Sequence, residues 1–206
     1  IDVEEPMGNM IIDIGGGTSD IAIWQGDELR YQVSVRLAGR EILLNALRSK
    51  PEFLERFGTD VSLLRNLKTR LIDFYAQADA LISREGDNWL KQLPNKMGQP
   101  ETKKLVQILT LGLSGLFYYI GTVLGLLIER KEYKPEIPDI YVGGNGSKMF
   151  HWLTSGSYDP NHPINELLRQ MLHQASGLKN SSGQQMRIVL SPNPKCEAAR
   201  GLVGTK

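Results

Sequence analysis

The stretch that decides the fold is IIDIGGGTSD at residues 11–20. A short apolar run over residues 10–14 stops at three consecutive glycines, and a second apolar run follows over residues 20–24. Short apolar runs bounded by glycines are typical of strands. We therefore expect a hairpin whose turn is made by the three glycines. Because a strand and not a helix follows the turn, the pattern excludes a Walker loop and a Rossmann turn.

The glycine turn also has the chemistry of an anion site. Glycines let backbone N–H groups approach an anion without side chains in the way, and the hydroxyl of Thr18 can meet a phosphate oxygen. Asp13 and Asp20 flank the turn, and carboxylates can hold Mg²⁺ through water. The residues alone leave an alternative open, in which this is a glycine hairpin whose aspartates cap the turn.

Outward from the hairpin, strands and helices follow in an order typical of an α/β protein with a mixed sheet. The sheet is expected to combine a three-stranded antiparallel meander with parallel strands. The predicted elements are strands at 10–14, 20–24 and 29–35, helices at 40–57 and 60–84, a loop at 87–101, a helix at 105–128, a strand at 139–142, a helix from about 147, a helix at 164–175, a strand at 186–190 and a helix at 194–204.

Composition excludes several classes of function. The 206 residues carry 24 Lys and Arg against 23 Asp and Glu, for a net charge of +1. This balance argues against a nucleic-acid partner held by bulk charge. The single cysteine, Cys196, cannot form an internal disulfide, and the three histidines show no spacing of a zinc site.

An uncharged apolar segment at residues 105–128 raises the question of a membrane span. As a helix it would be about 36 Å long, which exceeds the ~30 Å core of a bilayer. Gly121 and Gly125 have the spacing of a membrane helix-packing motif. The alternative is a buried helix of a globular domain, with apolar residues at helical intervals. We expect the buried helix, because a spanning segment would separate glycine motifs that we expect to form one site.

Two further motifs lie after this segment. The stretch IPDIYVGGNGSK at 137–148 predicts a strand that ends at two glycines and a helix that begins soon after. A helix N-terminus attracts phosphate, although an ordinary strand-to-helix turn has the same pattern. The stretch NPKCEAARGL at 193–202 carries small residues that permit close packing of a final helix.

Taken together, the order of the three motifs resembles the actin and heat-shock chaperone ATPase superfamily. They are similar to its second phosphate motif, its adenosine motif and its closing helix, and residues 13–31 also resemble the bacterial cell-division and plasmid-segregation actin homologues. The resemblance implies a ribonuclease H-like, actin-type ATPase lobe. Residues 1–206 would form the second, C-terminal lobe with a helical insertion at about 40–130, and a first lobe would precede Ile1.

The resemblance also implies roles for the residues of the glycine hairpin. Asp13 would position the attacking water and, with Asp20, would lie near the Mg²⁺ ion. Thr18 would contact the γ-phosphate. The β- and γ-phosphates would bind the backbone N–H groups of Gly15, Gly16 and Gly17.

Other positions are implied to face the rest of the nucleotide. Gly143 and Gly144 match glycines beside the α-phosphate and ribose, and Gly39 matches a turn near the nucleotide. Ser147 falls where the chaperones place an arginine over the base, and Lys148 could substitute for it. Residues 76–83 lack the charged side chains that sandwich adenine in those chaperones, so the base stays open.

The resulting functional expectation is a lobe that binds ATP or ADP with Mg²⁺ in a cytoplasmic actin-like or chaperone-like ATPase. The isolated chain is expected to hydrolyse ATP poorly, because half of the site belongs to the missing lobe. That lobe, and a protein partner or self-assembly, are the expected contacts. One alternative is a pseudo-ATPase scaffold or interaction module. Another is a different enzyme of the same fold, such as a sugar kinase or an exopolyphosphatase.

Overall fold

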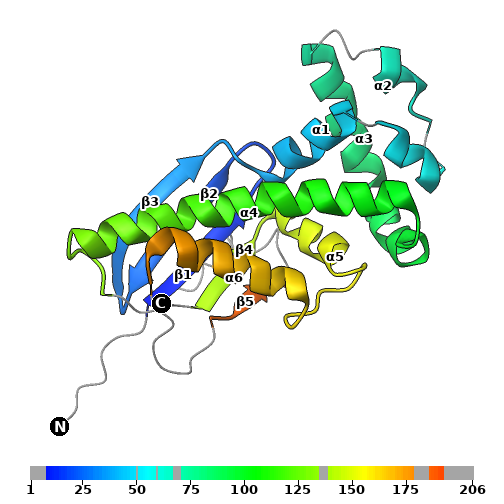
Figure 1. The fold of residues 1–206 in the computed structure, drawn as a ribbon. Helices are drawn as coiled ribbons and strands as arrows, with labels where there is room; N and C mark the ends of the chain where they lie inside the picture. Colours follow the sequence, from blue (N-terminus) through cyan, green and yellow to red (C-terminus); the bar gives the residue numbers. More distant parts are fainter. Residues whose placement is uncertain are drawn as a thin grey trace.

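The computed structural model describes residues 8–49, 51–58, 60–66, 71–134, 139–178 and 186–192 (Figure 1). The helix predicted at 194–204 lies outside these residues. In chain order, the elements are β1 (Gly8–Ile14), β2 (Ser19–Gln25), β3 (Glu28–Val35), α1 (Gly39–Ser49), the 3-10 helix η1 (Pro51–Phe57), α2 (Ser62–Asn66), α3 (Leu71–Gln92), the 3-10 helix η2 (Leu93–Lys96), α4 (Pro100–Glu129), β4 (Asp139–Gly143), the 3-10 helix η3 (Asn145–Lys148), α5 (Met149–Leu153), α6 (Pro163–Ser176) and β5 (Ile188–Leu190).

The sheet has the predicted mixed topology. Its strand order is β3-β2-β1-β4-β5. The first three strands form an antiparallel meander, and β4 and β5 add to it in parallel with β1. A two-residue turn joins β2 to β3, and its first residue, Gly26, has a φ of 58°. This left-handed conformation suits the turns that connect twisted hairpin strands.

Buried and exposed side chains alternate along the central strands, so the sheet has one buried face and one face open to solvent. On β1, Met10, Ile12 and Ile14 are fully buried, whereas Ile11 between them is 46% exposed. Helices α4 and α6 run side by side along the sheet in Figure 1 and share the most extensive helix–helix contact. On β4 the residue in register with Ile11, Tyr141, is 43% exposed. The apolar residues at alternate positions of the strands thus form the face of the sheet that packs against the helices.

Glycines set the close packing of α4 on α6. A Cβ on Gly121 would collide with the backbone carbonyl of Leu172, and one on Gly125 would lie 3.0 Å from the carbonyl oxygen of Ser176. Both carbonyls belong to the last turns of α6. The spacing that resembled a membrane motif therefore serves packing between two helices of the same chain, because small residues let helix backbones approach closely in either setting.

The apolar character of α4 follows from its place in the core. By length and composition alone, α4 could cross a membrane. Its buried residues recur along the helix and include Leu105, Leu109, Leu113, Leu116, Phe117, Ile120, Leu124 and Leu127. These side chains pack into the main hydrophobic cluster with the sheet. Burial on this face accounts for the apolar residues that recur at helical intervals along α4.

The loop predicted at 87–101 is wrong. Helix α3 continues to Gln92, η2 follows, and Pro100 already occupies the first turn of α4. Trp89 and Leu93 are each 1% exposed, so apolar residues in a polar stretch anchor the helix to the core. Tertiary burial overrides the local composition. Proline suits the first turn of a helix because its missing N–H would have no intrahelical partner there.

The predicted helix boundaries before α4 are also wrong. The helix predicted at 40–57 divides into α1 and η1, and Pro51 begins the second piece. The helix predicted at 60–84 corresponds to α2 and to α3, which continues to Gln92, and residues 67–70 between the two lie outside the described residues. The carboxylate of Asp60 accepts a hydrogen bond from the backbone N–H of Ser62 at 2.9 Å, which caps the start of α2. Pro51 interrupts the apolar pattern that made residues 40–57 look like one helix.

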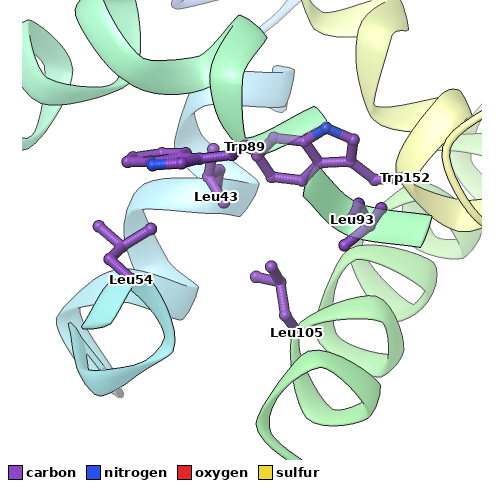
Figure 2. Close-up of a pocket in the computed structure, with 6 residues that line it drawn as sticks. All are labelled: Leu43, Leu54, Trp89, Leu93, Leu105 and Trp152. Atoms are coloured by element: carbon purple, nitrogen blue, oxygen red, sulfur yellow. The ribbon is translucent and has the colours of Figure 1, made fainter. Parts of the chain in front are cut away.

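Figure 2 shows an apolar junction where α1, η1, α3 and η2 meet α4 and α5. The rings of Trp89 and Trp152 lie with their centroids 6.4 Å apart and tilted at 56°. Four leucines complete the lining: Leu43, Leu54, Leu93 and Leu105. The gap between these side chains is too narrow for a water molecule. The junction is therefore packed core and holds the helices of this region together.

A pair of glycine substitutions on α4 tests this packing. Gly121→Ala should lower the free energy of unfolding by about 1–3 kcal/mol, because the new methyl group must push α6 away. The matched control is Gly115→Ala on the same helix, where a Cβ meets nothing within 4 Å. There alanine should raise the free energy of unfolding by about 0.5–1 kcal/mol through helix propensity. Urea unfolding of the two variants checks both signs, and equal effects would contradict the packing.

Candidate functional site

The site begins where the ends of β1 and β4 meet. Asp13 is in register with Gly143, the last residue of β4. The next residue, Gly144, has a φ of 76°, and a Cβ there would collide with the carboxylate of Asp13 and lie 2.5 Å from the carbonyl oxygen of Ile14. Only glycine combines this backbone conformation with so close an approach. The strand-to-helix turn thus rests directly on the end of the first strand.

The start of α1 joins the same point. A Cβ on Gly39 would lie 2.7 Å from the Cα of Gly146, and one on Gly146 would lie 2.8 Å from the carbonyl oxygen of Ile14. Sequence reasoning assigned Gly39 to the site but left Gly146 out. The signal was present in the Asn-Gly pair that follows Gly143 and Gly144. Three segments distant in sequence therefore pack backbone on backbone.

The glycine hairpin lies next to this junction. The backbone N–H of Gly15 donates to the carbonyl oxygen of Thr18 at 2.9 Å and closes the turn. The tip, at Gly16, Gly17 and Thr18, is exposed. Exposed glycine N–H groups with few side chains around them are suited to an anion. The predicted hairpin is thus present, with its tip open to solvent.

A buried serine ties the hairpin to the loop before α1. The hydroxyl of Ser19 donates to the carbonyl oxygen of Leu37 at 2.6 Å, and Ser19 is fully buried. This contact spans 18 residues and places the chain just before Gly39 beside the hairpin. Sequence reasoning missed Ser19. Its only signal was its place two residues before Ile21 and four before Ile23, the apolar positions of the strand that follows.

The two predicted metal-binding carboxylates lie on adjacent strands. Asp13 and Asp20 are directly opposed across the β1–β2 pair, so their side chains share one face of the sheet. Asp20 is exposed and Asp13 is partly buried. Within the described ranges, no group of three His, Cys, Asp or Glu residues is placed to hold a metal. Two carboxylates fit Mg²⁺, which keeps several waters and takes its remaining ligands from phosphate.

Ser147 and Lys148 engage protein groups. Ser147 is 2% exposed, and its hydroxyl donates to the carbonyl oxygen of Gly144 at 2.7 Å. It therefore closes the turn between β4 and η3. The ammonium group of Lys148 lies 2.6 Å from the carboxylate of Asp87 on α3. Exposed ion pairs of this kind contribute at most about 1 kcal/mol to stability, so the lysine can exchange Asp87 for a more highly charged anion. Both nucleotide contacts stay predictions.

Hydrogen bonds after η3 hold β5 beside β4. The backbone N–H of Tyr158 donates to Nδ1 of His151 at 3.1 Å, and the hydroxyl of Tyr158 donates to the carbonyl oxygen of Ile188 at 2.5 Å. Burial raises the pKa of Tyr158 to about 12, so the hydroxyl keeps its proton at neutral pH. Burial, with the charge of Lys148, lowers the pKa of His151 and favours the neutral ring that accepts the bond. This loop therefore fixes the sheet edge.

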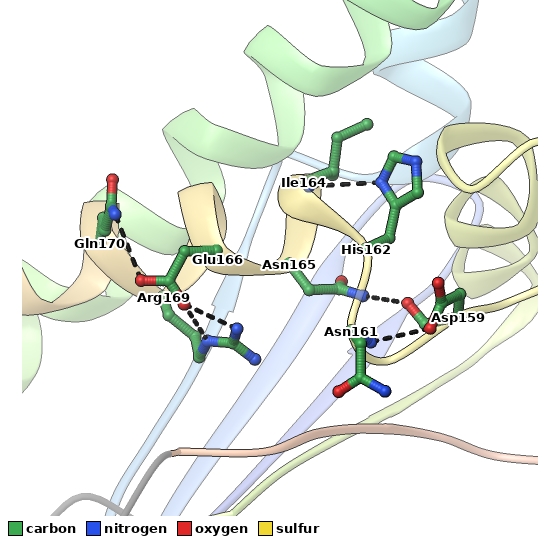
Figure 3. A network of polar contacts seen from close by, with 8 residues as sticks. All are labelled: Asp159, Asn161, His162, Ile164, Asn165, Glu166, Arg169 and Gln170. Atoms are coloured by element: carbon green, nitrogen blue, oxygen red, sulfur yellow. Dashed lines mark hydrogen bonds and ion pairs between the residues drawn. The ribbon is translucent and has the colours of Figure 1, made fainter.

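Figure 3 shows a polar network at the start of α6. The side chain of His162 accepts from the N–H of Ile164 at 3.3 Å and caps the helix. The amide of Asn165 donates to the carbonyl oxygen of Asp159 at 2.7 Å. On the next turn Glu166 pairs with Arg169 at 2.7 Å. Each of these contacts is local to the helix start and serves structure.

Comparisons with known proteins agree with the first of the sequence motifs. The family model described as MreB/Mbl protein matches residues 1–49. The cell shape-determining protein Mbl of Bacillus cereus is 34% identical over 68 residues, which cover 31% of this chain and 20% of that relative. The chain thus spans about a fifth of the curated relative that it matches.

Two solved structures show weaker likeness. The ethanolamine utilization protein EutJ of Carboxydothermus hydrogenoformans aligns with 95% of this chain and 46% of its own, at a TM-score of 0.46 and 10% identity. A Bacillus thuringiensis ParM hybrid protein with ADP aligns with 90% of this chain and 25% of its own, at a TM-score of 0.41 and 17% identity.

The sequence match covers the part of the chain that carries the glycine hairpin. Residues 1–49 include β1, β2, β3 and α1, and with them the hairpin glycines and Gly39. The predicted resemblance to the actin-like ATPase superfamily is thereby confirmed. The predicted fold class is confirmed as well, since the sheet has the expected mixture of antiparallel and parallel strands.

A substitution at Gly144 tests the geometry of the site. Gly144→Ala should lower the free energy of unfolding by about 2–4 kcal/mol, since it combines a positive φ with a collision against Asp13. Gly177→Ala is the control, because Gly177 has a similar φ of 68° but open space around it. It should cost only about 1–2 kcal/mol. Thermal and urea unfolding compare the two, and equal losses would show that Gly144 does not press on Asp13.

Proposed function

We propose that this chain, whose glycine hairpin is that of an actin-like ATPase, binds the phosphates of ATP or ADP together with Mg²⁺. The observation that carries the proposal is the backbone packing of Gly39, Gly144 and Gly146 at the end of β1. Such packing leaves no room for side chains there. It brings the hairpin tip and the β4–η3 turn, both rich in glycine, close to the carboxylate of Asp13. Anion-binding loops present backbone N–H groups with no side chains in the way.

Each group at the site has a role in holding phosphate. The exposed N–H groups of Gly16 and Gly17 bind phosphate oxygens, and the hydroxyl of Thr18 donates to the terminal phosphate. Asp13, fixed against the Gly144 turn, orients the attacking water. Asp13 and Asp20 would hold Mg²⁺, which would neutralise negative charge on the phosphates. Phosphoryl transfer depends mainly on such positioning and electrostatic stabilisation.

We further propose that the chain acts as the second lobe of a cytoplasmic two-lobed ATPase. The hairpin tip is exposed, so water competes with phosphate for its N–H groups. A second lobe closing over the tip would exclude that water and strengthen the electrostatic contacts. The isolated chain should therefore bind nucleotide with low affinity and hydrolyse it slowly. In this proposal, the helices between β3 and β4 are an insertion that contributes to the part of the site that faces the nucleotide base.

A pseudo-ATPase scaffold is the second candidate. The observation in its favour concerns the residues expected to face the nucleotide base. The ammonium group of Lys148 pairs with Asp87 and so is already engaged by the protein. On the same helix as Asp87, Ala76 and Ala80 are exposed and offer no charged groups to a base. A scaffold of this kind would keep the fold and its surfaces without binding nucleotide. The two candidates therefore differ in whether nucleotide binds at all.

The proposal is tested by the Mg²⁺ dependence of nucleotide binding. Isothermal titration of the 206-residue chain with ADP should give saturable binding that is at least about tenfold tighter with Mg²⁺ than with chelator, a gain of about 1.4 kcal/mol. Asp13→Ala should abolish most of that gain, because it removes a carboxylate that holds the ion.

Asp27→Ala is the matched control. Asp27 is an exposed aspartate in the turn between β2 and β3, at the opposite end of the hairpin strands. The Asp27→Ala substitution removes the same charge but should leave the gain in affinity from Mg²⁺ unchanged. Equal losses in both variants would mean that the effect comes from the net charge of the chain and not from a carboxylate that holds the ion. Absence of saturable binding to the native chain would favour the scaffold.

A further inference from the structure

One face of α4 stays open to solvent although it is apolar. Leu111 is 75% exposed, Tyr118 49% and Leu126 48%. These residues lie three or four residues apart, or at multiples of such steps, and so line one side of the helix. The α4 stripe, as we name it, consists of Lys104, Gln107, Leu111, Gly115, Tyr118, Thr122, Leu126 and Glu129, all of them exposed.

The stripe lies on the side of α4 away from its packed neighbours. The opposite side of the helix is buried and includes Leu109, Leu116 and Leu124. On that side Gly121 packs against α6. Figure 1 shows α4 running the length of the domain. From Lys104 to Glu129 the stripe is about 38 Å long at about 1.5 Å per residue. Over this length the stripe exposes Leu111, Tyr118 and Leu126, and large apolar side chains gathered on one exposed face are typical of an interaction site.

The two charged residues of the stripe lie at its opposite ends and have opposite signs. It begins at a basic residue, Lys104, in the second turn of the helix and ends at an acidic residue, Glu129, in the last turn. Between them the stripe carries no charge. A second α4 helix laid antiparallel on the first would place each Lys104 opposite the partner's Glu129. A parallel arrangement would instead place like charges side by side.

The same antiparallel register gives complementary shapes. With Lys104 opposite Glu129 of a second copy, Gly115 lies opposite Tyr118, and Leu111 lies opposite Thr122. A Cβ on Gly115 would meet nothing within 4 Å, so this glycine leaves a hollow that a tyrosine ring can fill. Small residues opposite large ones are the condition for close packing of helices. Both charge and size are thus self-complementary about one two-fold axis.

We propose that the α4 stripe binds a second copy of this chain, in an antiparallel α4–α4 pair with two-fold symmetry. Such an isologous contact closes after two copies and does not propagate. It involves none of the residues assigned to the nucleotide site. It therefore goes beyond the proposed function and can stand or fail independently of it. The two copies would leave their glycine hairpins accessible.

Charge reversal tests the register of the pair. Sedimentation equilibrium of the 206-residue chain should show a monomer–dimer equilibrium. Lys104→Glu and Glu129→Lys should each raise the dimer dissociation constant by about tenfold, because each places two like-charged pairs across the interface. The double variant restores opposite charges in the same positions. It should return the dissociation constant to within about threefold of the native value.

A second variant tests the apolar part of the stripe. Leu111→Asp should raise the dissociation constant at least about 100-fold, since it places a charge opposite Thr122 in a buried contact. Position 111 is exposed in the monomer, so circular dichroism and the melting temperature should change little. A native chain that stays monomeric up to millimolar concentration would overturn the proposal. So would a dimer indifferent to these changes, or a double variant without recovery.

A membrane surface is the competing occupant. Vesicles of phosphatidylethanolamine and phosphatidylglycerol, mixed with the native chain and with Leu111→Asp, distinguish the two. Dimerisation without vesicle binding supports the α4 pair. Vesicle binding that Leu111→Asp abolishes, in a chain that does not dimerise, would assign the stripe to the lipid and overturn the proposal.

Discussion

The approach of the Gly144 backbone to the end of β1 is the contact on which the site depends. A side chain at this position would force the β4–η3 turn away from Asp13 and Ile14. The parallel pairing of β1 with β4 carries the turn to this point, and the α1 start meets it through Gly39. Loss of that contact would separate the glycine segments and leave Asp13 beside an open loop.

Helix α4 supports this arrangement by packing against the sheet, α6 and α1. It buries one side against the sheet and admits α6 through Gly121 and Gly125, while Gly112 faces Ile42 of α1. Because α1 begins at Gly39, the packing of α1 on α4 also positions the site. One apolar helix therefore explains both the hydropathy of the chain and the placement of a glycine far from the hairpin.

The sequence predicted the sheet well because its strands are marked locally. Glycines bound the strands at residues 15–17 and 143–144, and alternation gives the buried face. It failed at 87–101, where the helix depends on Trp89 meeting Trp152, a contact between residues distant in sequence. Ser19 and Gly146 were missed for the same reason. Their importance comes from Leu37 and Gly39, which no local pattern connects to them.

The most direct measurement is nuclear magnetic resonance of the backbone amides during titration with ADP and Mg²⁺. Binding through one cradle predicts that amides of residues 15–18 and 143–147 shift together, with a single dissociation constant, while the amide of Gly26 at the far turn stays unchanged. Shifts confined to one of the two segments, or equally large at Gly26, would contradict a phosphate site built from both.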